Sequence, residues 1–349
     1  MKKIIQRLGL VLLIVLPGPL YAQGLADEIA GLQGILEQLY DEMIALAGDI
    51  IPIGRSLAGF GAMLYIGYRV WGHIARAEAI DFYPLLRPFA LGLVLTLYMQ
   101  VIGLFNSILK PTVSVTSGMV KNSDAAIKKL LKDKEDAIKQ SDEWLIYQGP
   151  NGEGDRDAWY KYTHPGSTED EGFFEEIGND IRFSMSKYYY QFKNSVKQWM
   201  SEILQVLFQA AALCINTLRT FHLVILVILG PIVIGLSVYD GFQHSLTQWI
   251  ARYINIYLWL PIANIFGALI GKIQEGMIKL DIGQIKENGD TFFSATDTAY
   301  LVFMIIGIIG YFTVPSVANY VIHAHGGNGL LSRANRAGAS TIGMFTGKR

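Results

Sequence analysis

Five strongly apolar segments, with a polar segment between the second and the third, constrain this chain more than any other feature. The segments are residues 51–71, 85–109, 221–239, 250–270 and 299–322, and each has about the 20 residues that cross a bilayer. Residues 121–200 hold twelve Lys or Arg and fifteen Asp or Glu. This pattern predicts an all-α, polytopic membrane protein with about five transmembrane helices and a helical extracytoplasmic domain between spans two and three.

The composition supports a membrane protein and argues against general affinity for nucleic acids. Charged residues make up 17% of the chain, against about 25% in a typical soluble domain. The net charge is −1, which lacks the basic excess that broad binding to nucleic acid requires. The single cysteine, Cys214, lies in an apolar run, so the chain contains no intramolecular disulfide.

The first 22 residues have the pattern of a secretory signal peptide. Lys2, Lys3 and Arg7 precede or flank a short apolar core, and Ala22 offers a small residue for a cut before Gln23. If the segment is not cut, it stays as an anchor whose basic end is cytoplasmic. In both cases the chain that follows begins on the outer side of the membrane, so the expected topology is the same.

Residues 23–49 are predicted to form a periplasmic amphipathic helix. Its apolar residues follow a heptad spacing over about three repeats, between acidic flanks. These residues are Leu25, Ile29, Leu32, Leu36, Leu39, Met43 and Leu46. Two interpretations remain open: the helix packs on a neighbouring subunit, or it folds onto its own chain or the bilayer.

Basic residues predict the orientation of the spans. The short loop between spans one and two carries Arg69, Arg76 and Arg87, and the tail 323–349 carries four basic and no acidic residues. Both are therefore expected in the cytoplasm. An outside N-terminus and an inside C-terminus need an odd number of spans. Residues 199–239 are accordingly expected to cross once, although their length also allows two crossings with Arg219 at the turn.

These signals divide the chain into six expected regions. The periplasmic region 111–199 contains a charged helix, a segment rich in Gly, Pro and acidic residues, and from Phe173 a long helix that enters the membrane. The expected regions are a signal peptide (1–22), the periplasmic helix (23–49), spans one and two (50–110), the periplasmic domain (111–199), spans three to five (200–322) and a basic cytoplasmic tail (323–349).

No arrangement in the sequence predicts catalysis, a cofactor or a metal site. Neither a GxxxxGK[ST] nor a GxGxxG phosphate loop occurs. His323 and His325 form a short metal-like pair, and His164 stands near Asp155 and Asp157, but incidental positions explain both groups as well. The chain is therefore expected not to be an enzyme.

Polar and small residues inside the spans point to helix contacts. Asn255, Asn264 and Asn319 either form hydrogen bonds between helices or line a hydrated path. Gly267 and Gly271 form a GxxxG face that allows close helix contact within or between subunits. Together with the heptad seam, this face is our predicted oligomer contact. Three prolines in the last three spans are expected to kink or break them, namely Pro231, Pro261 and Pro315.

Residues 228–274 resemble the core of the TrbL-type inner-membrane components of type IV secretion systems. The shared pattern is a Gly-Pro inside one span, a short loop that ends in Trp, and a following span with Leu-Pro. The matching positions are Gly230, Pro231, Trp249, Leu260 and Pro261. The stretches AEAIDFYPLLRPF, GEGDRDAWYKYTHP and VFMIIGIIGYFTVPSVANY are similar to the TraJ proteins of conjugative transposons, and this resemblance covers nearly the whole chain.

The resemblance implies a channel or platform subunit in the inner membrane of a conjugative DNA-transfer machine. Such subunits form homo-oligomers and contact the minor pilin, the core-complex proteins and the ATPases. They contact the DNA–protein substrate only transiently, and the family offers no catalytic residues. The alternatives are a small-molecule transporter, a membrane-bound enzyme or a regulatory, exclusion-type membrane protein. We find no repeated halves of the kind that mark many transporters.

Overall fold

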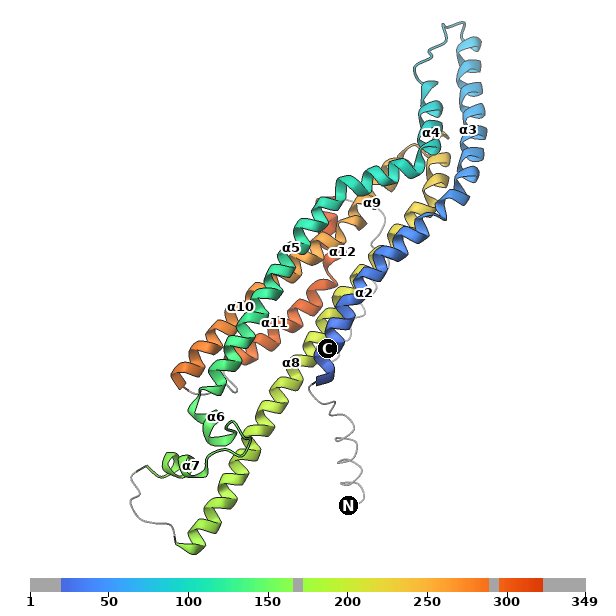
Figure 1. Ribbon diagram of the computed structural model, residues 1–349. Helices are drawn as coiled ribbons and strands as arrows, with labels where there is room; N and C mark the ends of the chain where they lie inside the picture. Colours follow the sequence, from blue (N-terminus) through green and yellow to red (C-terminus); the bar gives the residue numbers. More distant parts are fainter. Residues whose placement is uncertain (1–19, 166–171, 289–294, 323–349) are drawn as a thin grey trace, which may run out of the picture. The chain divides into compact units, whose positions relative to one another are not determined.

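All the regular secondary structure in the described part of the chain is helical. In the computed structural model, residues 20–165, 172–288 and 295–322 are described, and no β-strand occurs within them. Figure 1 shows their helices. In chain order these are α2 (Leu20–Ile44), α3 (Ala47–Ala75), α4 (Leu86–Thr96), α5 (Tyr98–Lys139), α6 (Asp142–Tyr147), α7 (Arg156–Thr163), α8 (Phe173–Leu236), α9 (His244–Tyr257), α10 (Trp259–Asn288), α11 (Ala295–Tyr311) and α12 (Val314–Val321).

Capping residues set the starts of the short helices. The Ser141 hydroxyl accepts a hydrogen bond from the backbone N–H of Trp144 at the start of α6. The Asp155 carboxylate accepts one from the N–H of Ala158 at the start of α7, at 2.9 Å. Both bonds satisfy donors that the first turn of a helix leaves free. Asp155 therefore has a structural role as a helix cap.

The helices support the predicted membrane architecture. Three stretches are long and apolar enough to cross a membrane: Ala47–Ala75, Ile203–Leu236 and His244–Glu287. Two interrupted pairs, α4 with α5 and α11 with α12, pass the same test when each pair counts as one span. The described residues thus contain three to five candidate spans, and the prediction of an all-α polytopic membrane protein is confirmed.

Two expected spans differ in detail from the sequence-based prediction. The second is bent by 76° between α4 and α5, at a break that contains neither glycine nor proline. The third belongs to α8, which continues without a turn from Phe173 to Leu236 and contains Pro231 in its interior. Pro315 lies in the first turn of α12, where a missing backbone N–H costs least. Pro261 lies just after the break between α9 and α10, four residues beyond Tyr257.

The contacts divide the chain into two compact units, each built from distant segments. The first unit comprises Met1–Ile35, Val113–Ile215 and Ala263–Phe312, and the second comprises Leu36–Thr112, Asn216–Ile262 and Thr313–Arg349. Residues 1–19 and 323–349, with most of the expected signal peptide and the whole basic tail, lie outside the described residues. The two units are described separately below.

In the second unit, α3 and α4 form a helical hairpin, and α3 packs against the C-terminal part of α8. Gly54 lies directly against the backbone of Pro231, and a Cβ atom at Gly61 would stand 2.8 Å from the Tyr239 ring. The Tyr239 hydroxyl donates to the carbonyl oxygen of Leu57 at 3.1 Å. Small residues therefore allow close helix contact here.

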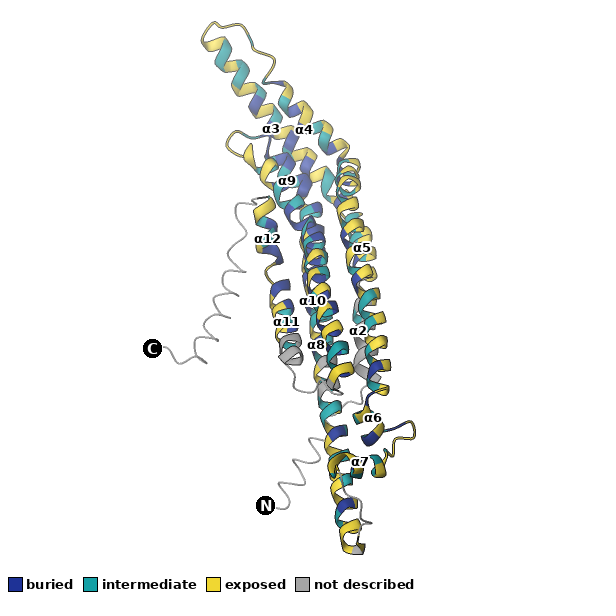
Figure 2. Cartoon of the chain, turned by 90° about the vertical axis from the view of Figure 1, so that its left-hand side faces the viewer, coloured by how far each residue is buried: buried dark blue, intermediate teal, exposed yellow. Residues whose placement is uncertain are grey.

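The other face of α3 carries large exposed apolar side chains, which suits contact with lipid. They are Phe60, Met63, Leu64, Tyr68 and Trp71. Exposed residues are frequent along this hairpin in Figure 2.

In the first unit, α10 packs closely on α5 and α11. Gly271 lies against the Ser123 side chain of α5, and a Cβ atom at Gly267 would stand 2.7 Å from the Tyr311 hydroxyl of α11. The short helices α6 and α7 pack together and cover one face of α8. The Trp159 and Phe183 rings provide one of these contacts, with centroids 5.7 Å apart.

Candidate functional site

The Gly-Pro positions of α8 lie at a contact among α5, α8 and α9 in the second unit. The Tyr98 hydroxyl and the Trp249 ring both reach the surface of Gly230, where any Cβ atom would collide with them. Tyr98 donates a hydrogen bond of 2.6 Å to the carbonyl oxygen of Val227, and Trp249 Nε1 donates one of 2.9 Å to that of Leu226. Tyr98 is fully buried and Trp249 is 5% exposed.

The position of Pro231 explains why Tyr98 binds the Val227 carbonyl. In an α-helix the N–H of residue i bonds to the carbonyl of residue i−4, and proline has no N–H. Pro231 therefore leaves Val227 without its intrahelical donor. A buried carbonyl in an apolar region needs a partner. Tyr98 provides that partner from α5, and Gly230 provides the space for its ring.

Arg219 and Pro261 repeat this relationship on the next pair of helices. Pro261 leaves the carbonyl of Tyr257, four residues earlier, without its intrahelical donor. Arg219 Nε, from α8, donates to this carbonyl at 3.2 Å, and its guanidinium lies 4.8 Å from the centroid of the Tyr257 ring. Arg219 Nη1 also contacts Asn216 Oδ1 at 3.4 Å. Two prolines of the TrbL-like pattern are thus each matched by a donor from another helix.

Arg219 is a buried charge without a bound carboxylate. It is 9% exposed, and no Asp or Glu among the described residues lies within ion-pair distance of it. Its acceptors are a backbone carbonyl, an amide oxygen and an aromatic face. Ionisable residues in membrane helices are costly and are usually kept for a function. Arg219 is therefore the strongest candidate for a functional side chain in this region.

A closed ring of three hydrogen bonds ties α2, α5 and α9 together. Tyr253 donates to Asn106 Oδ1 at 2.6 Å, Asn106 Nδ2 donates to the Tyr40 hydroxyl at 3.2 Å, and the two tyrosine hydroxyls lie 2.7 Å apart. Each group can both donate and accept, so the ring satisfies all three. The Trp249 ring stacks on Tyr253, with centroids 5.8 Å apart, and so connects this ring to the Gly-Pro contact.

The predicted intramembrane asparagines make contacts within the chain. Asn255 Nδ2 donates to Asn319 Oδ1 at 3.0 Å and to the Ile322 carbonyl at 2.7 Å, which joins α9 to the end of α12. In the first unit, Asn264 Nδ2 donates to Thr116 Oγ1 at 3.2 Å. Asn255 is only 4% exposed. These are hydrogen bonds between helices of the kind that the packing interpretation expects, and a role of these asparagines in lining a hydrated path stays a hypothesis.

Some of the residues predicted to contact another subunit instead contact other helices of the same chain. The face of Gly267 and Gly271 is covered by α5 and α11, so these glycines serve contact within one subunit. In α2, Leu36 is buried, whereas Leu32 is 45% exposed. Ile29, Leu39 and Met43 are half-buried, Leu46 lies beyond the end of α2, and the side chain of Leu25 lies outside the described part. An intersubunit role for the seam stays a prediction.

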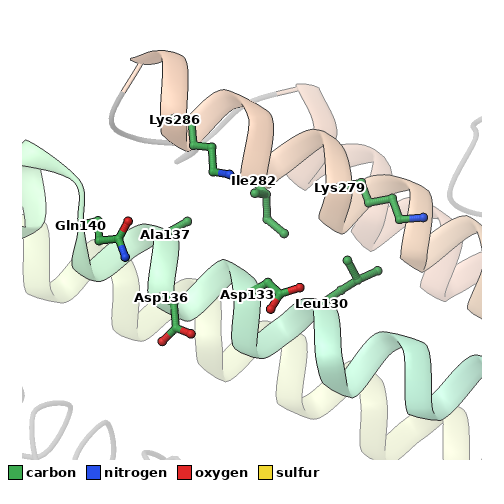
Figure 3. A pocket seen from close by; sticks show the side chains of 8 residues that line it. All are labelled: Leu130, Asp133, Asp136, Ala137, Gln140, Lys279, Ile282 and Lys286. Atoms are coloured by element: carbon green, nitrogen blue, oxygen red, sulfur yellow. The ribbon is translucent and has the colours of Figure 1, made fainter.

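A groove of about 450 Å³ separates α5 and α10 in the first unit (Figure 3). Its α5 wall carries Asp133 and Asp136, and its α10 wall carries Lys279 and Lys286. Nearby, Lys134 of α5 forms an ion pair with the buried Asp281 of α10. The Lys134–Asp281 ion pair therefore joins α5 and α10 beside this groove.

The described residues contain no group of three His, Cys, Asp or Glu side chains with the arrangement of a metal site. His164 stacks on the Tyr160 ring, with centroids 4.6 Å apart, and its Nδ1 contacts Thr163 Oγ1 at 3.0 Å. His323 and His325 lie outside the described residues.

Comparison with known proteins identifies one family. Residues 27–348 match the family model described as homologues of TraJ from Bacteroides conjugative transposon. This range includes all the hydrogen-bonded contacts of the second unit described above. No curated protein and no solved structure matches the chain.

Proposed function

Because the chain belongs to the family of homologues of TraJ from the Bacteroides conjugative transposon, we propose that it is an inner-membrane subunit of a conjugative type IV secretion system. Family membership points to a role in conjugative transfer. The finer proposal is a non-catalytic channel or platform that supports the passage of DNA–protein substrate and the assembly of the pilus. Partner ATPases supply the energy.

The single observation that carries this proposal is the family match over residues 27–348. Three to five candidate membrane spans in the described residues agree with a subunit that resides in the membrane. The two proline-linked contacts give the second unit fixed joints between helices, which suits a platform that must hold partners in position.

The proposed orientation follows from the charge pattern of the sequence. The mature N-terminus and residues 111–199 face the periplasm, and the loop with Arg69 and Arg76 and the basic tail face the cytoplasm. The periplasmic side is then available to the minor pilin and core-complex proteins, and the cytoplasmic side to the ATPases. A homo-oligomer is part of this proposal.

The test is a clean in-frame deletion made separately in donor and in recipient cells. We expect transfer from the deleted donor to fall to the detection limit and to return when the intact gene is supplied on a plasmid. Deletion in the recipient alone should leave transfer unchanged. Unchanged transfer from the deleted donor would overturn the proposal, and an effect confined to recipients would favour a regulatory, exclusion-type protein.

A further inference from the structure

A stripe of exposed apolar side chains runs along α8 before the membrane segment. Its members are spaced by four, four, three and four residues, so they share one face of the helix. Each is large and 46% to 71% exposed. The stripe consists of Ile177, Ile181, Met185, Tyr188 and Phe192.

The opposite face of α8 is already covered within the first unit. Phe183 packs on Trp159, and Tyr190 stacks on Tyr147 with ring centroids 5.2 Å apart. Asn179, on the same side as these two residues, is 4% exposed. The helix therefore has an inner face against α6 and α7 and a second apolar face without described cover.

The exposed area is large for a water-facing helix. Aromatic side chains bury about 150–250 Å² each when covered, so five large side chains at this exposure present several hundred Å². Soluble monomers rarely leave contiguous apolar patches larger than a few hundred Å², and such patches usually mark an interaction site.

The charge pattern argues against burial of this stripe in the bilayer. Residues 173–202 contain eight charged residues, and the candidate span begins at Ile203. Because α8 is one continuous helix, Phe192 stands about 16 Å and Ile177 about 39 Å along the axis from Ile203. A helix that continues directly into a membrane span cannot also lie flat on the membrane surface. The stripe therefore projects away from the hydrocarbon.

We propose that this stripe packs against the same stripe of a second copy of the chain, with the two α8 helices parallel. Every copy in the membrane anchors α8 in the same direction, so the stripes of neighbouring copies stand at the same height. Spacings of three and four residues are those of parallel helix seams. Exposed polar residues such as Arg182 border the stripe and remain in water.

This surface would be the contact between copies in the proposed homo-oligomer. The inference rests on the proposed function only for the statement that copies assemble in one membrane. The test below measures crosslinking and does not measure transfer. Failure of the stripe contact and failure of the transfer role are therefore distinguishable.

The experiment places single cysteines on α8 of the full chain and oxidises isolated membranes. Cys214→Ser removes the only native cysteine, so no internal disulfide can form and a disulfide-linked species of twice the mass joins two copies. We expect a disulfide-linked dimer with Met185→Cys or Ile181→Cys. The matched control is Glu176→Cys, an exposed position nine residues from Met185 and about 180° around the helix. It should give no dimer, because a disulfide needs Cα atoms within about 7 Å.

A second measurement uses a different substitution, so that the test does not depend on the cysteine variants alone. Met185→Glu should shift the detergent-extracted protein from oligomer to monomer, and Glu176→Gln should not. The absence of a dimer at both Met185→Cys and Ile181→Cys would overturn the proposal, as would equal crosslinking at Glu176→Cys. A cysteine at position 185 that neither crosslinks nor reacts with a soluble maleimide would also overturn it, because another segment or protein would then cover the stripe.

Discussion

The hydroxyl of Tyr98 donates a hydrogen bond of 2.6 Å to the carbonyl oxygen of Val227. This carbonyl is the one that Pro231 deprives of its intrahelical donor, and Arg219 serves the carbonyl of Tyr257 in the same way for Pro261. Inside a membrane no water is present to donate a hydrogen bond to such a carbonyl, so a side chain from another helix must donate it. A Pro in a span thereby becomes a specific joint between helices.

Tyr98→Phe should lower the free energy of unfolding by about 1–3 kcal/mol, because it leaves the buried Val227 carbonyl without a donor. The measurement is thermal unfolding of the purified protein in detergent. Tyr83→Phe is the control, since Tyr83 is 84% exposed and should change nothing.

A double-mutant cycle assigns this loss to the proline. Pro231→Ala restores a backbone N–H for Val227, so Tyr98→Phe should cost clearly less in that background than in the wild type. Equal costs in both backgrounds would show that the Tyr98 hydroxyl does not compensate for Pro231.

Arg219→Ala should likewise destabilise the protein by about 1–3 kcal/mol, since it removes the donor to the Tyr257 carbonyl. Combination with Pro261→Ala should recover part of the loss. Arg76→Ala serves as control, because the Arg76 side chain is 71% exposed and its ion pair with Glu78 contributes little. A loss with Arg219→Ala that is no greater than that with Arg76→Ala would argue against the joint.

Gly230→Ala should destabilise the protein by about 1–3 kcal/mol through overpacking, because the added Cβ atom meets the Tyr98 hydroxyl and the Trp249 ring. Gly92→Ala in α4 adds the same atom into open space, and there the better helix propensity of Ala should leave stability equal or higher. Both variants are compared by the amount of membrane-inserted protein on an immunoblot and by the thermal midpoint of unfolding. A harmless Gly230→Ala would contradict the close contact.

Lys134→Ala should cost about 3–5 kcal/mol, because it leaves the buried carboxylate of Asp281 unpaired. Replacing both partners, as Lys134→Met with Asp281→Leu, should be much less harmful than the single change. Lys139→Ala on the same helix breaks an exposed pair with Glu135 and should be nearly neutral. If the double variant is as unstable as Lys134→Ala, the pair matters for more than charge compensation.

Local patterns in the sequence predicted much of the fold. The long helix from Phe173 followed from its apolar period, and the candidate spans followed from hydropathy over about 20 residues. The bend between Thr96 and Tyr98 could not be predicted, because neither a glycine nor a proline marks it. At this bend the fully buried Tyr98 begins α5 and donates its hydroxyl to the carbonyl of Val227, a long-range contact that the local sequence does not reveal.

The sequence revealed only part of the candidate functional site. Pro231 and Pro261 are apparent at once, and the i−4 rule identifies Val227 and Tyr257 as the carbonyls that need donors. The donors could not be assigned, because Tyr98 lies 129 residues from Val227. The hydrogen-bonded ring of Tyr40, Asn106 and Tyr253 joins three helices, and Tyr40 and Tyr253 are 213 residues apart in the sequence. No local pattern in the sequence predicts it.

In the proposed function, the transferred DNA–protein substrate passes along or beside this subunit in the donor membrane. The most direct measurement is formaldehyde crosslinking of mating donors, followed by immunoprecipitation of the tagged protein and quantification of bound DNA. We expect enrichment of the transferring element over a non-mobile plasmid of equal copy number, and loss of that enrichment when the partner ATPases are inactive. Equal recovery of both DNAs, or recovery of neither, would contradict it.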